Sequence, residues 1–195
     1  QDILMAGPPS GWSGARPLGL HLEGPFLNIA KKGAHNPAYL RAPSLQAVEG
    51  WSPASAVRLV TLAPELPGAT EVIETLAARG VVVSAGHSMA SYEAAEVGFT
   101  AGARYSTHLF NAMTGLHHRE PGMVGAALAH AQHAELIPDL LHVHPGAIRA
   151  ALRAIPCVYC VSDATAAATM PDGDYRLGRH RVLKCMGGVR LPDGR

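Results

Sequence analysis

Short apolar runs recur along the chain, and each carries polar or charged residues at its C-terminal end. In the first, LGLHLE (18–23), leucine alternates with glycine, histidine and glutamate before Gly24-Pro25 ends the run. Runs of this kind predict buried strands, here at 18–23, 57–62, 81–85, 103–108, 135–143 and 157–162. Segments with helical spacing of apolar positions lie between them and predict helices at 67–79, 91–101 and 146–154.

Alternating strands and helices predict a parallel sheet with right-handed crossovers, either an open doubly wound sheet or a (β/α)8 barrel. The sequence contains no G-x-G-x-x-G turn of the dinucleotide-binding type. Reactive side chains instead lie at or just beyond the ends of separate predicted strands, where barrel enzymes assemble their sites. These side chains are Glu23, His87, His108, His142 and Asp163.

A complete barrel has eight strands and typically about 250 residues. We therefore expect a partial (β/α)8 TIM-type barrel over 1–172, with about six of the eight βα units and two strands missing on the N-terminal side. The segment 173–195 differs, because two short runs flank Gly187-Gly188 and predict a hairpin. We expect it to begin an appended β-sandwich layer.

Composition argues against several classes of partner. Sixteen Lys and Arg residues face 15 Asp and Glu residues, and no basic run is present, so neither nucleic acid nor a membrane surface is an expected partner. The sequence has no apolar run of membrane-spanning length and no signal-peptide pattern at its start, which predicts a cytoplasmic protein. Three cysteines fit a reducing compartment. Cys157 and Cys160, three apart on a strand, are expected to be packed thiols rather than a metal or redox pair.

Glu23, His87 and His108 supply one carboxylate and two imidazoles. Catalytic zinc uses this ligand set and leaves its fourth position to water, and non-haem Fe(II) centres use it too. Each residue also has an ordinary structural interpretation: Glu23 in an ion pair, His87 as a helix cap and His108 as a hydrogen-bonded core histidine. Their shared position at strand ends favours a metal site.

Asp163 ends the last predicted strand, in the stretch VYCVSDATAA. A carboxylate there can take a proton from a metal-activated water and return it to a leaving group. The alternative is that Asp163 caps a following turn.

Seven motifs occur in one order along the chain: GLHLEGPFLN, KKGAHNP, VVVSAGHS, THLFNAM, REPG, LHVHP and VSDA. On these motifs the chain resembles the N-acetylglucosamine-6-phosphate deacetylase family of the amidohydrolase superfamily from about Leu18 onward. The resemblance implies deacetylation of N-acetylglucosamine 6-phosphate to glucosamine 6-phosphate and acetate, in amino-sugar catabolism. It further implies one divalent metal ion, zinc before iron, manganese or cobalt, and a homodimer.

The resemblance assigns roles to individual residues. Glu23, His87 and His108 would bind the metal, Asp163 would activate water and protonate the departing amine, and His35 would polarise the acetyl carbonyl. The residues implied to line the sugar phosphate site are Ala34, His35, Asn111, Ala112, Arg119 and His142.

Arg119 would reach the site of the neighbouring subunit. Apart from the resemblance, its guanidinium is suited to binding phosphate, because its forked donors match phosphate geometry. The alternative is a surface arginine paired with Glu120.

Three departures from the family pattern stand out. Leu140 follows Asp139 where the family has an Asp-Gly pair before His142, which affects the backbone there if the glycine adopts an unusual φ. The superfamily's first β layer and His-x-His strand have no counterpart, and the chain ends at PDGR, before the family's serine-containing loop. We therefore expect a fragment lacking the N-terminal part and the C-terminal end.

Three other functions are compatible with some of these residues. One is an amidohydrolase acting on a different amide, whose phosphate-free substrate would give Arg119 and His142 no anion to hold. Another is a catalytically incompetent fragment. An Fe(II) oxygenase is disfavoured, because that chemistry needs neither Asp163 as a proton shuttle nor His35.

Overall fold

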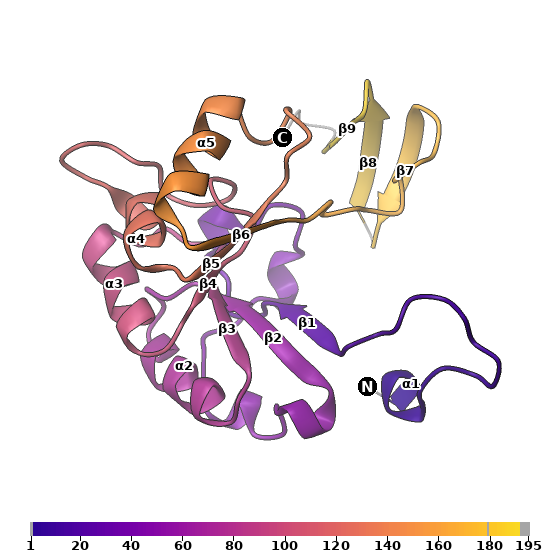
Figure 1. Ribbon diagram of the computed structural model, residues 1–195, viewed down its shortest axis with the longest axis horizontal. Coiled ribbons are helices and arrows are strands. Elements are labelled where there is room, and N and C mark those ends of the chain that lie inside the picture. Colours follow the sequence, from indigo (N-terminus) through magenta and orange to yellow (C-terminus); the bar gives the residue numbers. More distant parts are fainter. Residues whose placement is uncertain (1, 179, 192–195) are drawn as a thin grey trace.

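The computed structural model describes residues 2–178 and 180–191. Its main sheet has six strands, all parallel and each paired with the next along the chain. They are β1 (Leu20–Glu23), β2 (Val57–Leu62), β3 (Val82–Ala85), β4 (Tyr105–Ser106), β5 (His133–Leu136) and β6 (Cys157–Cys160) (Figure 1). Parallel strands in unbroken sequence order are the arrangement of a (β/α)8 barrel, so the predicted partial barrel is confirmed.

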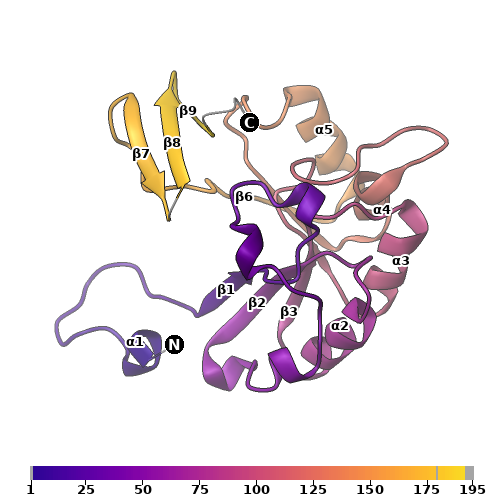
Figure 2. The same cartoon turned by 180° about the vertical axis from the view of Figure 1, so that it is seen from behind.

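Helices follow the strands and curve around the outside of the sheet (Figures 1 and 2). They are α2 (Ala69–Ala78), α3 (Tyr92–Thr100), α4 (Gly122–His130) and α5 (Pro145–Ala154). Three match the predicted helices. Helix α4 was not predicted, because six of its nine residues are buried and a helix buried on most sides has no amphipathic period to detect.

The connection between β1 and β2 contains the short 3₁₀ helices η1 (Ile29–Lys31), η2 (Pro37–Tyr39), η3 (Gln46–Val48) and η4 (Pro53–Ser55). An N-terminal helix, α1 (Asp2–Ala6), precedes a largely exposed segment that leads into β1 (Figure 2). None of the described helices is long and apolar enough to cross a membrane.

The core lies between the strands and the helices. Val72, Ile73 and Leu76 of α2 are fully buried, as are Val60 and Leu62 of β2. Burying a side chain of this size contributes about 1.5–3 kcal/mol. This apolar layer fixes the strands, and therefore fixes where their C-terminal ends meet.

The strands also bury polar side chains, and several of these are hydrogen-bonded to one another. Thr61 Oγ1 lies 2.7 Å from His21 Nε2 and 2.6 Å from Thr107 Oγ1, which in turn lies 2.6 Å from Ser84 Oγ. Buried polar groups cost free energy unless they are hydrogen-bonded. This network therefore joins β1, β2, β3 and the end of β4 beneath the candidate site.

A second, antiparallel sheet follows, with strands β7 (Gly173–Leu177), β8 (His180–Cys185) and β9 (Gly188–Arg190) in that order. The predicted hairpin is confirmed, with the turn at Met186-Gly187, both in the left-handed region. Residue 1 of the predicted range 1–172, and residues 179 and 192–195 of the range 173–195, lie outside the described residues. The division into two domains at 172/173 stays a prediction.

Two expectations were wrong. The strand predicted at 135–143 is β5, which begins at His133 and ends at Leu136, because Pro138 has no backbone N–H for a ladder and Asp139 starts a turn. The thiols of Cys157 and Cys160 are exposed rather than packed. They lie on β6, which pairs only with β5 among the described strands.

Candidate functional site

Glu23, His87 and His108 converge at the C-terminal end of the parallel sheet. Glu23 ends β1, His87 lies two residues beyond β3, and His108 lies two residues beyond β4. Glu23 Oε1 is 2.7 Å from His87 Nε2 and 3.9 Å from His108 Nε2, and the two Nε2 atoms are 2.9 Å apart. These ligand atoms all lie within 4.8 Å of one another.

The backbone at this end of the sheet is strained. His87, His108 and Asp163 have φ values of 49°, 28° and 46°, in the region that favours glycine. Each such conformation costs an L-residue about 1–2 kcal/mol. Strain of this kind persists where surrounding contacts enforce it and clusters at functional sites. Here it occurs at two of the three converging residues and at Asp163.

The orientation of the His87 ring fits a cation at this point. His87 Nδ1 lies 2.6 Å from the carbonyl oxygen of Lys31, which can only accept, so Nδ1 carries a proton. The other nitrogen of His87, Nε2, faces Glu23 Oε1 and His108 Nε2, so in the neutral ring its lone pair is available to a cation held among the three atoms. Both imidazoles are buried, and such a ligand set matches catalytic zinc.

Electrostatics keep the Glu23 carboxylate charged. Burial alone would raise the pKa of Glu23, but the interactions of its carboxylate with the side chains of His108, His35 and His87 outweigh burial and hold the pKa far below its usual value. Burial lowers the pKa of His108, and the hydrogen bond and charge of Glu23, with the charge of Asp163, raise it above its usual value. Asp163 therefore acts electrostatically on the ligand set.

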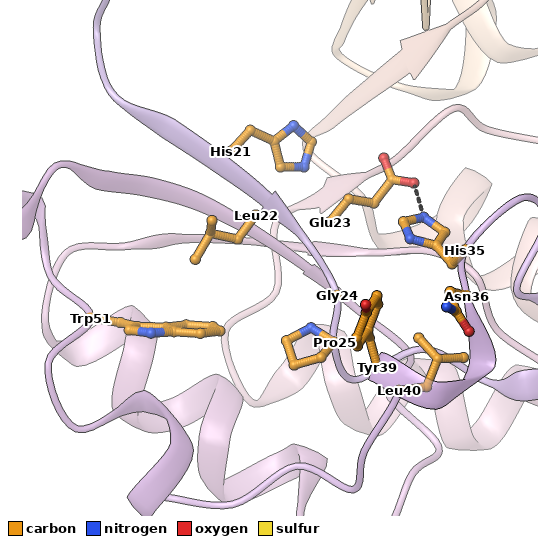
Figure 3. Close-up of a pocket in the computed structure, with 10 residues that line it drawn as sticks. All are labelled: His21, Leu22, Glu23, Gly24, Pro25, His35, Asn36, Tyr39, Leu40 and Trp51. Atoms are coloured by element: carbon orange, nitrogen blue, oxygen red, sulfur yellow. Dashed lines mark hydrogen bonds and ion pairs between the residues drawn. The ribbon is translucent and has the colours of Figure 1, made fainter. Parts of the chain in front are cut away.

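His35 joins the same cluster. Its Nε2 lies 2.9 Å from Glu23 Oε1, and its ring meets the edge of the His87 ring with centroids 5.0 Å apart. Figure 3 shows the His35 ring directly beside the Glu23 carboxylate, joined to it by this contact. Both residues line a cavity of about 330 Å³. Trp51 and Tyr39 also line this cavity (Figure 3).

A larger cavity, of about 790 Å³, lies between the ends of β5 and β6 and the antiparallel sheet. Ala34, His142 and Asp163 line it, together with Lys184 and Arg190. Three predicted site residues from distant parts of the sequence therefore share one cavity.

His142 lies on the loop after β5, where Asp139 holds it. The Asp139 carboxylate accepts from the backbone N–H of Leu141 and His142, at 2.9 and 2.8 Å, and lies 2.6 Å from His142 Nδ1. Leu140 has a φ of 65°. The position where the family pattern has glycine thus adopts a glycine-like conformation, and His142 still lines the cavity.

Leu140→Gly should raise the free energy of unfolding by about 0.5–1 kcal/mol. Removing the left-handed strain gains about 1–2 kcal/mol, and the freedom of glycine in the unfolded chain costs about 0.5–1 kcal/mol. Thermal unfolding measures this. Leu141→Gly is the matched control: Leu141 is also exposed but has no positive φ, so its replacement should destabilise. Equal destabilisation by both would contradict the strain at Leu140.

Of the remaining predicted site residues, Asn111 and Ala112 lie close to the metal ligands and Arg119 does not. Asn111 Nδ2 donates to the His108 carbonyl at 3.2 Å, and the Ala112 carbonyl accepts from Ser88 N at 3.1 Å, so both lie in the turn after His108. Arg119 lies on an exposed loop before α4. Within the described residues its guanidinium makes no hydrogen bond or ion pair, so the Glu120 pairing is not formed and the reach across a subunit boundary stays a prediction.

Glu65 was missed from the sequence. It lies three residues beyond β2 and accepts hydrogen bonds from the segments that follow Glu23 and His87. A carboxylate just past a strand end is the same signal that identified Glu23, so it could have been found.

No family model matches the chain, but individual proteins do. The N-acetylglucosamine-6-phosphate deacetylase of Rattus norvegicus is 44% identical over 180 residues, which cover 87% of this chain and 44% of the rat protein. An N-acetylgalactosamine-6-phosphate deacetylase of Escherichia coli O157:H7 is 42% identical over 188 residues, covering 94% of this chain and 50% of that protein. The chain spans about half the length of the curated relatives it matches.

Solved structures agree. The N-acetylglucosamine-6-phosphate deacetylase of Pasteurella multocida superposes with a TM-score of 0.85 at 34% identity, over 95% of this chain and 49% of that one. A mutant of the N-acetyl-D-glucosamine-6-phosphate deacetylase of Mycobacterium smegmatis, in complex with N-acetyl-D-glucosamine-6-phosphate, superposes with a TM-score of 0.80 at 37% identity. The match covers 89% of this chain and 47% of that one. Over the half of those proteins that it spans, the chain is a homologue of the N-acetylglucosamine-6-phosphate deacetylases.

Proposed function

We propose that the chain carries the centre of a metal-dependent deacetylase that hydrolyses the acetamide of N-acetylglucosamine 6-phosphate. The products would be glucosamine 6-phosphate and acetate, in amino-sugar catabolism. The observation that carries this proposal is the convergence of Glu23, His87 and His108 at one end of the parallel sheet, in a chain homologous to such deacetylases.

Glu23, His87 and His108 would hold one divalent cation, with zinc the first candidate and iron, manganese or cobalt the alternatives. When bound, such a cation supplies a Lewis acid that lowers the pKa of a coordinated water to about 7. The Lys31 carbonyl supports this role by fixing which nitrogen of His87 faces the site.

Asp163 would move the protons. It would take a proton from the attacking water as general base and give one to the departing amine as general acid. Its charge already acts on His108, and it lines the larger cavity.

His35 would donate a hydrogen bond to the acetyl oxygen and stabilise the negative charge that develops there. Its position beside Glu23 supports this role.

The sugar phosphate would lie in the larger cavity. Ala34 and His142 line it, and Asn111 and Ala112 lie in the turn beside His108. Arg119 would complete the phosphate site from the partner in a homodimer, since a guanidinium matches phosphate geometry.

A second candidate substrate is N-acetylgalactosamine 6-phosphate, favoured by the Escherichia coli relative at 42% identity. The two sugars differ only in the configuration at one carbon that carries a hydroxyl. The acetamide and phosphate are common to both, so the same metal site and proton transfers would serve either.

A substrate comparison tests this proposal. The zinc-loaded chain is assayed for acetate release from N-acetylglucosamine 6-phosphate, N-acetylgalactosamine 6-phosphate and unphosphorylated N-acetylglucosamine. We expect the highest kcat/KM for the first and a loss of orders of magnitude for the last, because the groups placed to bind the phosphate have no anion to bind without it. A higher value for the galactosamine substrate would favour the second candidate. Equal values with and without phosphate would point to a different amide, and no turnover with metal bound would make the chain catalytically incompetent.

A further inference from the structure

The carboxylate of Glu65 accepts three hydrogen bonds, which come from the loop after β1 and the loop after β3. Oε1 accepts from Asn28 Nδ2 at 2.9 Å and from Met89 N at 2.7 Å, and Oε2 accepts from Ser88 Oγ at 2.7 Å. Ser88 is fully buried and Glu65 half-buried. Every group facing Glu65 is a donor, so this position calls for a side chain with two acceptor oxygens.

The first route from Glu65 to the metal ligands runs through Asn28. The Asn28 backbone N–H donates to the His87 carbonyl at 2.9 Å, and Asn28 Oδ1 accepts from Ala30 N at 2.9 Å, which caps η1. Lys31, the last residue of η1, offers its carbonyl to His87 Nδ1. Glu65 thus holds the Asn28 side chain, and Asn28 caps η1. The last residue of η1, Lys31, then orients the His87 ring.

The second route is direct. Ser88 and Met89 follow His87, whose φ is 49°. Ser88 Oγ donates to Glu65 and accepts from Ala90 N at 2.9 Å. The Glu65 carboxylate therefore holds the chain on the far side of the strained residue, where a released loop could relax toward an ordinary backbone conformation.

We propose that Glu65 is a positioning residue, which aims His87 Nε2 at the metal site by tying the loop after β1 to the loop after β3. This inference rests on the proposed metal site, since Glu65 touches none of the three ligands itself. Partners that orient a ligating histidine typically change metal affinity by about 10- to 100-fold when they are removed.

Zinc affinity, measured by competition with a chelating dye, tests the role in Glu65→Ala and Glu65→Gln. We expect Glu65→Ala to bind zinc about 10- to 100-fold more weakly than the wild type. Glu65→Gln keeps an oxygen for Asn28 and Met89 and should recover part of that loss. Glu74→Ala, at an exposed glutamate of α2, is the matched control and should bind zinc normally.

The cobalt-loaded chain adds a readout of geometry. The visible absorption bands of bound Co(II) report the arrangement of its ligands, so Glu65→Ala should shift them and Glu74→Ala should not. A loss of stability alone would leave the bands of the folded fraction unchanged.

Asn28→Asp perturbs the same contact and replaces Glu65→Ala as the test if that variant does not fold. Asn28→Asp preserves the oxygen that caps η1 but turns a second carboxylate oxygen, instead of an amide donor, toward Glu65. We expect weaker zinc binding and altered cobalt bands here too. Wild-type affinity and bands in Glu65→Ala, or in Asn28→Asp, would overturn the positioning role. A wild-type chain that binds neither metal would instead overturn the proposed function from which this inference starts.

Discussion

Asp163→Asn should lower kcat by a factor of about 10² to 10⁴ while metal affinity stays nearly unchanged. That range is the usual contribution of general acid–base catalysis. The substitution keeps size and shape but removes the negative charge and, with it, the ability to take and return a proton. Asp163 lies beside the proposed ligands but is not among the three that converge, so the site should still bind its cation.

Steady-state kinetics at saturating zinc, with zinc content measured on the same samples, checks this expectation. Asp172→Asn is a suitable control, because Asp172 is exposed and accepts a hydrogen bond from Met186 N, which an amide oxygen can also do. Near-normal kcat in Asp163→Asn would show that another group moves the proton.

Glu23→Gln should weaken metal binding more than it weakens any other property of the chain. The substitution removes the anionic ligand, on whose Oε1 the side chains of His35 and His87 converge. Removing a group that only supports a ligand typically weakens metal binding by about 10- to 100-fold. We expect a larger fall in zinc affinity for Glu23→Gln, because Glu23 is itself a proposed ligand.

Competition titration of zinc gives the affinity, and Glu71→Gln, at an exposed glutamate of α2, serves as the control. A Glu23→Gln variant with wild-type affinity would remove Glu23 from the metal site. Chelation of the wild-type chain should abolish turnover, and added zinc should restore it.

The sequence predicted the sheet because its strands are short apolar runs with a polar residue at the end. Parallel strands finish at one edge, which is why Glu23 and His87, 64 positions apart, could be predicted to meet. The backbone strain could not be predicted in this way, since nothing in the sequence marks His87 as a residue with a φ of 49°.

The misses have physical causes. Helix α4 is buried on most sides and has no polar face, so its period is hidden. His142 was expected at a strand end, but Pro138 and Asp139 end β5 early and place it on a loop. Cys157 and Cys160 were expected to be packed, because an apolar run predicts burial without saying whether a neighbouring strand is there to provide it.

Anomalous diffraction at the zinc edge, from crystals of the zinc-loaded chain, shows whether Glu23, His87 and His108 together form one metal centre. We expect a single strong peak at the C-terminal end of the sheet, about 2.0–2.2 Å from Glu23 Oε1, His87 Nε2 and His108 Nε2. A peak elsewhere, or a fully loaded chain with no peak among these three atoms, would contradict a single centre at these residues.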